Sequence, residues 1–464
     1  MVIPKTKNRD EFRRVTYNLF ISLIFTYIRY MTEFQGFSVN FISTWYPRIC
    51  GIASFTEHSI KALTLNEENI RHIKIHPIDN NDLTYHYPVR DKHVIKQMDS
   101  SSWIEAAQMI IERHHKNETK GIRTVAILEH EYGLDGNGKE NNYTEVARRL
   151  KNAGVPNVVV LHTILKHPDG YQRDVIQQFG EYCDRLIIIT PSSKEILKQV
   201  YSIDDSKIVH IPHGIPETHK KMSRTDAKEK WGLSGRYIIS TIGLMSKNKG
   251  IEYGIRGFSR FLDVIHPDFR DRMVYLIAGQ THPEVLAKLG GKDPYREKLF
   301  EIAKEAGLNP ISCKVTKKLA FPDSKVIFLN KYLTDDEYIE LVKASESTLL
   351  PYQNPEQNSS GTLAYSIGLG SAVVSTKFRY AADIFSDSHG RPDGSGVLVD
   401  FTDVGKIADG LREVFENLTE IESKAYQKGV IMGWSVVGKQ YLNLLYQVSM
   451  KPSEIESAKI QFLS

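Results

Sequence analysis

The sequence predicts an α/β protein with two parallel sheets, and two observations lead to this fold class. The chain has 464 residues, about three times the length of a typical single domain, so two or more domains are expected. From residue 37 onward, short runs rich in β-branched residues alternate with helical stretches, which is typical of parallel sheets joined by helices. Hydrophobic residues make up 41% and charged residues 25% of the chain, as in ordinary globular proteins.

The predicted strands fall into two groups, one for each sheet. In the first half we expect strands at Ser38 to Ser43, Ile73 to Ile78, Thr124 to Glu129, Asn157 to His162, Leu186 to Thr190 and Ile208 to Pro212. In the second half we expect them at Tyr237 to Gly243, Met273 to Gly279, Val326 to Leu329, Ser347 to Leu350, Ala372 to Thr376 and Gly396 to Val399. Between the groups, Gly214 to Gly235 is polar and has no strand pattern, which predicts a linker between two domains.

Both ends of the chain lie outside these two groups. Val15 to Ile28 is an apolar run that follows two arginines, but it is shorter than the roughly 20 residues that span a bilayer. We expect it to pack as an amphipathic helix or to extend from the body, with peripheral membrane association as the alternative. At the other end, Gly433 to Tyr446 has apolar residues at helical spacing, which predicts a helix anchored by Trp434.

Charge and cysteine content narrow the class of protein. Sixty Lys and Arg against 56 Asp and Glu give a net charge of +4, spread evenly along the chain, which argues against a nucleic-acid partner. Cys50, Cys183 and Cys313 are widely spaced and form no CxxC or metal-ligand pattern, so we expect buried thiols in a reducing compartment. The predicted location is the cytoplasm, with the membrane surface as the alternative.

Residues 351 to 376 (PYQNPEQNSSGTLAYSIGLGSAVVST) form the most informative segment. A polar loop of small residues there runs into an apolar helix and then into a strand. Ser359, Ser360, Gly361 and Thr362 lack bulky side chains, so the backbone N–H groups at the start of the helix can approach a phosphate closely. The segment therefore predicts a site for a nucleoside diphosphate or a sugar phosphate.

Further site candidates follow the other strands, because ligands of open parallel sheets bind beyond the carboxyl ends of the strands. In the first half these candidates are Gly51, His130, Glu131 and His162. In the second half they are Gly243, Lys249, Gln280 and His282. If the two domains face each other, these groups meet across one cleft.

An ordered series of motifs gives the chain a resemblance to a known family. The motifs are RICGIASFT, VVVLHTIL, IPHGI, IGLMSKNKGIE, SGTLAYSIGLGSAVVST and MGWSVVGKQYLNLLY. In this order they resemble the retaining, nucleotide-sugar-dependent glycosyltransferases of family four, over roughly residues 37 to 450. The resemblance implies the GT-B architecture, in which two Rossmann-like domains face each other and a C-terminal helix crosses back to the first domain.

The resemblance also implies the extent of each part. We expect an N-terminal extension over residues 1–36 and an acceptor-binding domain over residues 37–215. A donor-binding domain is expected over residues 216–432. The crossover helix and a tail would occupy residues 433–464.

Individual roles follow from the same resemblance. Lys249 matches a lysine that contacts the donor diphosphate, and Ser359 to Thr362 match the backbone cradle for that diphosphate. His162 matches a histidine near the acceptor and the reacting sugar, so His162 and Lys249 are the predicted catalytic residues. The other predicted donor-binding residues are Gly243, Gln280, Glu356 and Gln357, and the predicted acceptor-binding residues are Gly51, His130 and Glu131.

The first departure from the family pattern concerns two carboxylates. Family members usually carry one carboxylate that contacts the transferred sugar and a second that contacts the ribose. This chain has Gln357 at the first position and Tyr365 at the second. Glu356 is adjacent and could substitute for the first carboxylate if the loop shifts by one residue.

The second departure is a missing arginine. Leu244 stands where the family commonly has an arginine that pairs with Lys249 on the diphosphate. Losing a bidentate guanidinium weakens phosphate neutralisation. We expect another cation, Lys247 or Arg379, to take its place.

The activity that the resemblance implies is transfer of a hexosyl group from a nucleotide sugar to a glycan, lipid or small-molecule acceptor, with retention of configuration. It implies no metal and no cofactor beyond the nucleotide sugar itself, and the sequence has no DxD, HExxH or Walker motif. Two alternatives remain: a glycoside phosphorylase with the same fold, and a catalytically silent protein that binds sugar nucleotides. Donor-dependent transfer distinguishes the enzyme from the silent protein, and dependence on phosphate identifies the phosphorylase.

Overall fold

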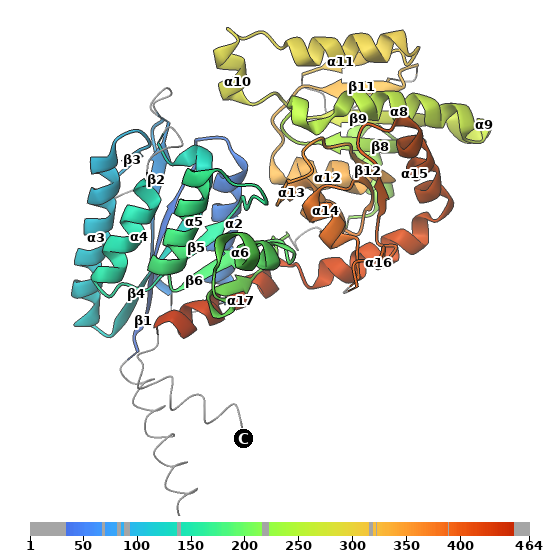
Figure 1. The fold of residues 1–464 in the computed structure, drawn as a ribbon. Helices are drawn as coiled ribbons and strands as arrows, with labels where there is room; N and C mark the ends of the chain where they lie inside the picture. The colour runs from blue at the N-terminus through green and yellow to red at the C-terminus, as the bar shows by residue number, and fades with distance from the viewer. Residues whose placement is uncertain are drawn as a thin grey trace, which may run out of the picture.

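The computed structural model describes residues 34–66, 70–80, 85–87, 93–136, 141–215, 222–314, 319–321, 323–387 and 389–449. They form two seven-stranded parallel sheets covered by helices (Figure 1). The apolar run Val15 to Ile28 and the tail after residue 449 lie outside the described residues. No helix among the described residues is long and apolar enough to cross a membrane.

The first sheet has the strand order β3-β2-β1-β4-β5-β6-β7. Its strands are β1 (Gly36–Ser43), β2 (Ile70–Asp79), β3 (Ile95–Lys96), β4 (Ile122–His130), β5 (Asn157–Leu161), β6 (Arg185–Ile188) and β7 (Ile208–His210). Its helices are α2 (Gly51–Asn66), α3 (Ser100–Glu118), α4 (Asn142–Asn152), α5 (Gly170–Tyr182) and α6 (Ser193–Tyr201).

The second sheet has the strand order β10-β11-β9-β8-β12-β13-β14. Its strands are β8 (Tyr237–Ile242), β9 (Met273–Ala278), β10 (Ile311–Cys313), β11 (Val326–Leu329), β12 (Ser347–Leu350), β13 (Ala372–Thr376) and β14 (Val397–Val399). Its helices are α7 (Arg224–Trp231), α8 (Ile251–Val264), α9 (Pro267–Arg270), α10 (Pro283–Lys288), α11 (Pro294–Glu305), α12 (Asp335–Ala344), α13 (Gly361–Gly368), α14 (Arg379–Ile384), α15 (Val404–Glu416) and α16 (Leu418–Val430).

The predicted strands are confirmed, each within a few residues of its expected position. Two strands were not predicted, β3 and β10, which have two and three residues and lie at the outer edges of the sheets. β3 (IK) is only two residues long, and β10 (ISC) lacks the apolar β-branched run that marked the equally short β14 (VLV).

Helices cover both faces of each sheet, which explains why the strands are continuous apolar runs. In β1, Phe37, Val39 and Phe41 pack in the cluster that includes Phe55 of α2, whereas Ile42 packs in the cluster on the opposite face. This alternation follows from the two-residue period of a strand.

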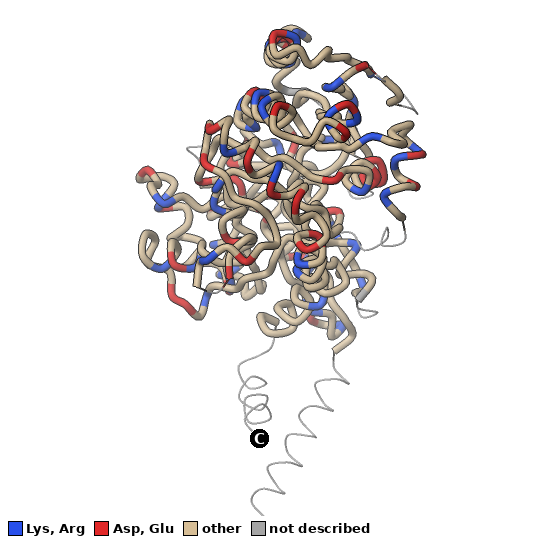
Figure 2. Tube along the Cα trace, turned by 90° about the vertical axis from the view of Figure 1, so that its right-hand side faces the viewer, with Lys and Arg blue, Asp and Glu red and all other residues tan. Residues whose placement is uncertain are grey.

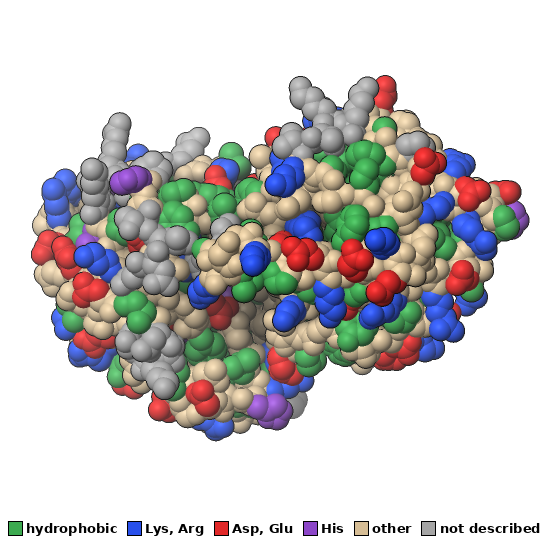
Figure 3. Space-filling view, turned by 90° about the horizontal axis from the view of Figure 1, so that it is seen from above, with side chains coloured by type: hydrophobic (Ala, Val, Ile, Leu, Met, Phe, Trp, Pro, Cys, Tyr) green, Lys and Arg blue, Asp and Glu red, His purple; other side chains and the backbone are tan. Residues whose placement is uncertain are grey.

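The two domains are joined by more than one crossing of the chain. The helix α17 (Trp434–Ser449) leaves the second domain and packs against α2 and β4 of the first domain (Figure 1). The two crossings are hydrogen-bonded to each other, because Ile215 N donates to Met432 O at 2.8 Å and Trp434 N donates to Ile215 O at 3.0 Å. The predicted crossover helix is thus confirmed. Seen from above, the domains form two lobes that meet at a waist (Figure 3).

The segment Gly214 to Gly235, predicted as a linker, contains the helix α7. The Ser223 hydroxyl caps this helix by accepting a hydrogen bond from Asp226 N, and Ser223 N donates in return to the Asp226 carboxylate. Trp231 is buried at the end of the helix. Part of this polar segment is therefore a surface helix, and its polar residues suggested a linker because most of them are exposed to solvent. The domain boundaries at residues 215 and 432 stay a prediction.

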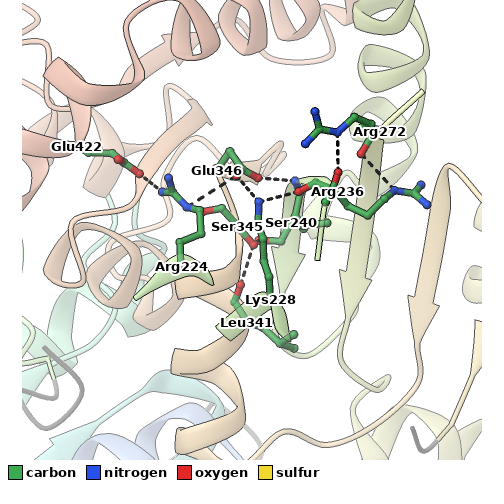
Figure 4. A network of polar contacts seen from close by, with 11 residues as sticks. Arg224, Lys228, Arg236, Ser240, Arg272, Leu341, Ser345, Glu346 and Glu422 are labelled. Atoms are coloured by element: carbon green, nitrogen blue, oxygen red, sulfur yellow. Dashed lines mark hydrogen bonds and ion pairs between the residues drawn. The ribbon is translucent and has the colours of Figure 1, made fainter. Parts of the chain in front are cut away.

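A polar network fastens α7 to the second sheet (Figure 4). Glu346, just before β12, is buried and accepts a hydrogen bond from Ile238 N of β8 at 2.6 Å. It also forms ion pairs with Lys228 and Arg224 of α7, and Arg224 pairs in turn with Glu422 of α16. The network thereby connects α7, at the start of the second domain, and α16, near its end, to the strands β8 and β12.

Candidate active site

Two adjoining cavities lie between the domains, at the carboxyl ends of both sheets. Cavity A, of about 260 Å³, includes Gln280, Tyr332, Asp335 and Tyr365 in its wall. Cavity B, of about 430 Å³, includes Arg48, Glu131, His162 and Gln357. The cavities share Cys50, Gly51, Phe55, His213, Lys249, Gly361 and Thr362. The two halves of the predicted site therefore do meet in one cleft.

The start of α13 lies at the junction of the two cavities. Ser360 is its N-cap, and its hydroxyl accepts a hydrogen bond from Leu363 N at 3.2 Å. Gly361 and Thr362 line both cavities, and Ser359 and Ser360 line cavity B. The unpaired backbone N–H groups and the positive end of the helix dipole make this junction suitable for an anion.

Lys249 lines both cavities beside the same helix start. Its ammonium lies 3.7 Å from the centre of the Tyr352 ring, an attractive cation–π geometry. The next residue, Gly250, has a φ of 59°, and a Cβ there would lie 2.1 Å from the carbonyl oxygen of Pro351. Only glycine fits this turn, which holds Lys249 against the loop after β12.

Gly243 and Gly279 form the floor of cavity A, where the loops after β8 and β9 touch. Both have positive φ angles, and a Cβ on Gly279 would lie 1.9 Å from the carbonyl oxygen of Gly243. Gln280 follows in the wall of the same cavity, next to Leu244. This part of the wall is formed largely by backbone, which leaves space for a ligand near Lys249.

His162 lies one residue beyond β5 in the wall of cavity B. Its Nε2 is 2.8 Å from Oε2 of Glu129, and its ring packs edge-on against Phe55, with the ring centres 5.0 Å apart. Sequence reasoning missed Glu129. The sequence did contain a signal, a single carboxylate at the end of the apolar run VAILE, in the strand that pairs with β5.

His130 does not lie in the wall of either cavity, so the prediction that it lies at the rim of the site is wrong. The side chain has no exposed surface and is surrounded by the rings of Tyr132, Tyr143 and Phe179. Burial lowers its pKa to about 3, so the imidazole is neutral. Glu131, the next residue, does line cavity B, and its Oε2 accepts a hydrogen bond from Thr163 at 2.7 Å.

Glu356 also lies outside the walls of both cavities, contrary to the prediction. It forms an ion pair with Arg379, and Arg379 donates a second bond to the carbonyl of Ile164 in the first domain. Arg379 is therefore buried in a contact between the domains rather than available as a phosphate ligand. Gln357 does line cavity B, where its amide donates to Ser359 O at 3.0 Å.

Asn358 is another residue that sequence reasoning missed. It is buried within the loop before α13, and its side chain accepts a hydrogen bond from Ser193 at 2.6 Å and donates one to the carbonyl of His162 at 3.3 Å. Thr190 also donates to its backbone carbonyl. These bonds attach the loop before α13 to the first domain, next to His162.

His213, in the IPHGI segment, lies in the wall of the cleft. It lines both cavities, and its Nδ1 lies 2.7 Å from the carbonyl oxygen of Gly214. Burial lowers its pKa to about 4, so the ring is neutral and Nδ1 donates this bond. The other nitrogen then faces Gly361 as an acceptor, because a Cβ on that glycine would lie 3.7 Å from it.

The cysteines and the potential metal ligands lie partly in and partly away from the cleft. All three cysteines are free. Cys183 is buried as predicted, whereas Cys50 and Cys313 are only half-buried, and Cys50 lines both cavities. Among the described residues, one group of three potential metal ligands is close enough to share an ion, His114, His115 and Glu118 of α3. These three residues do not line the cleft. Basic and acidic residues are interspersed along the described trace (Figure 2).

Comparisons with known proteins agree with this architecture. No protein-family model matches the chain, and no curated protein matches its sequence. Among solved structures, HepE from Anabaena in complex with UDP has a TM-score of 0.60 at 13% identity, and the match covers 88% of this chain and 100% of that one. A glycosyltransferase from Rickettsia africae has a TM-score of 0.62 at 12% identity, covering 89% and 99%.

A third structure is the UDP-forming trehalose-phosphate synthase from Burkholderia xenovorans. Its TM-score is 0.59 at 13% identity, and the match covers 89% of this chain and 99% of the synthase. These similarities extend over nearly the whole of both chains, and they include both sheets. The chain therefore has the GT-B fold, with two facing Rossmann-like domains, that these glycosyltransferases share.

Proposed function

We propose that this protein is a glycosyltransferase that moves a sugar from a nucleoside diphosphate to an acceptor hydroxyl in the cleft between its domains. The observation that carries the proposal is the junction of the two cavities, where Lys249 lies beside the N-terminus of α13. A diphosphate bound there would direct its nucleoside into one cavity and its sugar into the other. Among the structural neighbours, HepE has been crystallised with UDP and with UDP and glucose.

The proposed assignment of the cavities follows from their walls. Cavity A has aromatic and aliphatic walls, including Tyr332, Leu333 and Tyr338, which suit a flat base. Cavity B has more polar walls, with Glu131, His162 and Gln357, which suit the hydroxyl groups of the transferred sugar and of the acceptor. Arg48 of the first domain also lines this acceptor side.

In the proposed reaction, the bond between the anomeric carbon and the diphosphate oxygen breaks while the acceptor oxygen forms a new bond on the same face of the sugar. Lys249 and the backbone N–H groups of Ser360 to Thr362 would stabilise the charge that develops on the leaving diphosphate. A diphosphate oxygen would take the acceptor proton. His162, held by Glu129, would orient the sugar. Configuration would be retained, and no metal would be needed.

One observation favours a second candidate, a silent protein that binds sugar nucleotides. The loop before α13 has Gln357 in the wall and its neighbour Glu356 paired with Arg379. No carboxylate of this loop therefore faces the transferred sugar. Binding without transfer would be the result if such a carboxylate is essential.

The test is binding of UDP, GDP and ADP by calorimetry, followed by donor hydrolysis and transfer with the matching nucleotide sugars. Lys249→Ala should lose at least about tenfold in affinity, because a charged hydrogen bond is removed. Lys247→Ala is the matched control, because Lys247, which the sequence suggested as a replacement for the missing arginine, lies two residues away and lines neither cavity. Equal affinity in both variants would count against the proposal.

The activity measurements distinguish the alternatives. Binding with donor turnover supports a transferase, and binding with neither hydrolysis nor transfer supports the silent protein. Cleavage of a glycoside that requires inorganic phosphate, with no nucleotide binding, would identify the phosphorylase. Whichever activity is found, it is also measured for Lys249→Ala and for the control Lys247→Ala, and only Lys249→Ala should lose it.

A further inference from the structure

Cavity A has one carboxylate among the described residues of its wall, Asp335. This residue begins α12 of the second domain, directly after the N-cap Thr334. Its side chain is 48% exposed, so it is available to a ligand. Helix α13 contributes Tyr365 to this cavity, and the loop before α13 contributes no acidic side chain.

A chain of two hydrogen bonds holds Asp335 across the boundary between the domains. Oδ2 of Asp335 lies 2.8 Å from Nε2 of His58, in α2 of the first domain. The other ring nitrogen, Nδ1 of His58, lies 3.3 Å from the hydroxyl of Tyr365 in α13. One tautomer satisfies both bonds: the tyrosine hydroxyl donates to Nδ1, and Nε2–H donates to the carboxylate.

The second oxygen of this carboxylate is free for a ligand. No described residue donates a hydrogen bond to Oδ1 of Asp335. The hydrogen bond from His58 lowers the pKa of the carboxyl, although burial acts in the opposite direction, so Asp335 is ionised at neutral pH. An ionised carboxylate is an acceptor with several free lone-pair positions, which suits a pair of neighbouring hydroxyl groups.

We propose that Asp335 binds the ribose hydroxyl groups of the donor nucleoside, and that His58 is the positioning residue that orients it. This inference rests on the proposed function, because it assumes that a nucleoside diphosphate occupies the cleft. The nucleoside would then contact both domains, through Asp335 and through the wall that His58 and Phe55 form. The donor class is a ribonucleoside diphosphate sugar, selected against nucleosides without the vicinal diol.

The test compares UDP with 2′,3′-dideoxy-UDP, or the GDP or ADP pair if that base binds. The wild type should bind the ribonucleotide about tenfold to a hundredfold more tightly than the dideoxy form, because hydrogen bonds to a charged group are lost. Asp335→Asn should reduce this preference to less than about threefold. Asp336→Asn is the matched control: it removes the same charge from the same end of α12, and Asp336 does not line the cavity.

The positioning role has its own readout, the ratio of the two affinities. His58→Leu should lower that ratio, and His58→Gln, which keeps a donor, should restore part of it. If His58→Leu weakens both ligands equally, His58 has only a structural role. Asp335→Ser provides a second variant with a smaller side chain, and thermal melting of each variant reports the folded fraction.

The outcomes separate this inference from the proposed function. If the wild type binds nucleoside diphosphates but Asp335→Asn keeps the wild-type preference, the inference on Asp335 is overturned while the proposed function stands. Equal binding of the ribo and dideoxy forms by the wild type would overturn it as well. If no nucleoside diphosphate binds, both fail together.

Discussion

Nε2 of His162 lies 2.8 Å from Oε2 of Glu129, a carboxylate with no exposed surface. The two residues come from the adjacent strands β4 and β5, whose register pairs Glu129 with Val160. The sheet thus sets the orientation of the imidazole at the wall of cavity B before any substrate binds. The same sheet edge joins His162 to the second domain, through the bond that Asn358 donates to its carbonyl.

We expect Glu129→Gln to lower the transfer rate about tenfold or more and to leave nucleotide affinity unchanged. The amide preserves the volume of the side chain, but it loses the charge that holds the imidazole in place. Initial rates and calorimetric binding are measured for Glu129→Gln, for His162→Ala and for the double variant. Since the two residues would act as a unit, the double variant should be no slower than His162→Ala; additive losses would contradict the coupling.

The burial of His130 predicts a dependence of stability on pH. Burial lowers its pKa from 6.5 to about 3, so between these values the unfolded chain binds a proton that the folded chain does not. Acidification through this window therefore destabilises the native state. His130→Phe removes this proton uptake, and the aromatic ring suits the surrounding rings.

Urea unfolding of the wild type and of His130→Phe at pH 7.5 and at pH 5 measures this effect. The wild type should lose about 2 kcal/mol more than the variant between the two values, by the equivalence of pKa and free energy. Other titrating groups cancel in the comparison. The transfer rate of His130→Phe should be close to that of the wild type, and a severe loss would restore the role in acceptor binding that the sequence suggested.

The contact between Gly279 and Gly243 predicts that adding one methyl group at Gly279 lowers both stability and nucleotide affinity. Gly279→Ala places a Cβ 1.9 Å from a backbone oxygen, so the floor of cavity A must shift. Gly291→Ala is the control, because Gly291 has a φ of +80° but nothing within 4 Å of the added Cβ. We expect the control to cost about 1 to 2 kcal/mol of stability for its backbone strain. Gly279→Ala should cost more and should also weaken nucleotide binding, and equal costs would argue against a close approach.

The hydrogen bonds of Asn358 predict that this side chain holds the loop before α13 against the first domain. Asn358→Ala removes its bonds to Ser193 and to the carbonyl of His162, which leaves buried groups without partners at a cost of about 1 to 3 kcal/mol. We expect a larger radius of gyration in solution scattering and weaker nucleotide binding. Asn354→Ala, in an exposed part of the same loop, should change neither quantity.

The packing of Trp434 predicts that the crossover helix α17 contributes strongly to the stability of the protein. Its ring lies beside Phe55, His58 and His213, and a Cβ on Gly214 would lie 2.3 Å from it. Trp434→Ala should cost about 3 to 5 kcal/mol of stability, as for other buried aromatic truncations. Thermal melting and donor binding measure the loss, and unchanged values for both would show that the crossing is not anchored there.

Much of the fold could be predicted because it rests on local patterns. Runs such as NVVVL and YIISTI are apolar on both faces and therefore indicate central parallel strands. The edge strands β3 and β10 and the helix α7 escaped prediction, since their neighbours in space, rather than their own periodicity, stabilise them.

The site was predicted less completely than the fold. Residues chosen because they follow a strand, such as Lys249 and His162, do line the cleft, since parallel strands place their carboxyl ends at one edge. His130 fails the same rule because it is still part of β4, where a side chain can point into the core instead of into the cleft. The chemical roles of Lys249 and His162 stay predictions.

By itself, the sequence determined all strands except β3 and β10, the small residues at the start of α13 and the glycines of the turns, because each depends on the intrinsic preferences of a short segment. Only the tertiary structure decided which charged groups face the cleft. Glu356 is withdrawn into a pair with Arg379, and Asp335 is brought to cavity A by His58, a residue 277 positions away in the chain. No local pattern encodes such pairings, since the geometry of two packed domains determines which buried charges find partners.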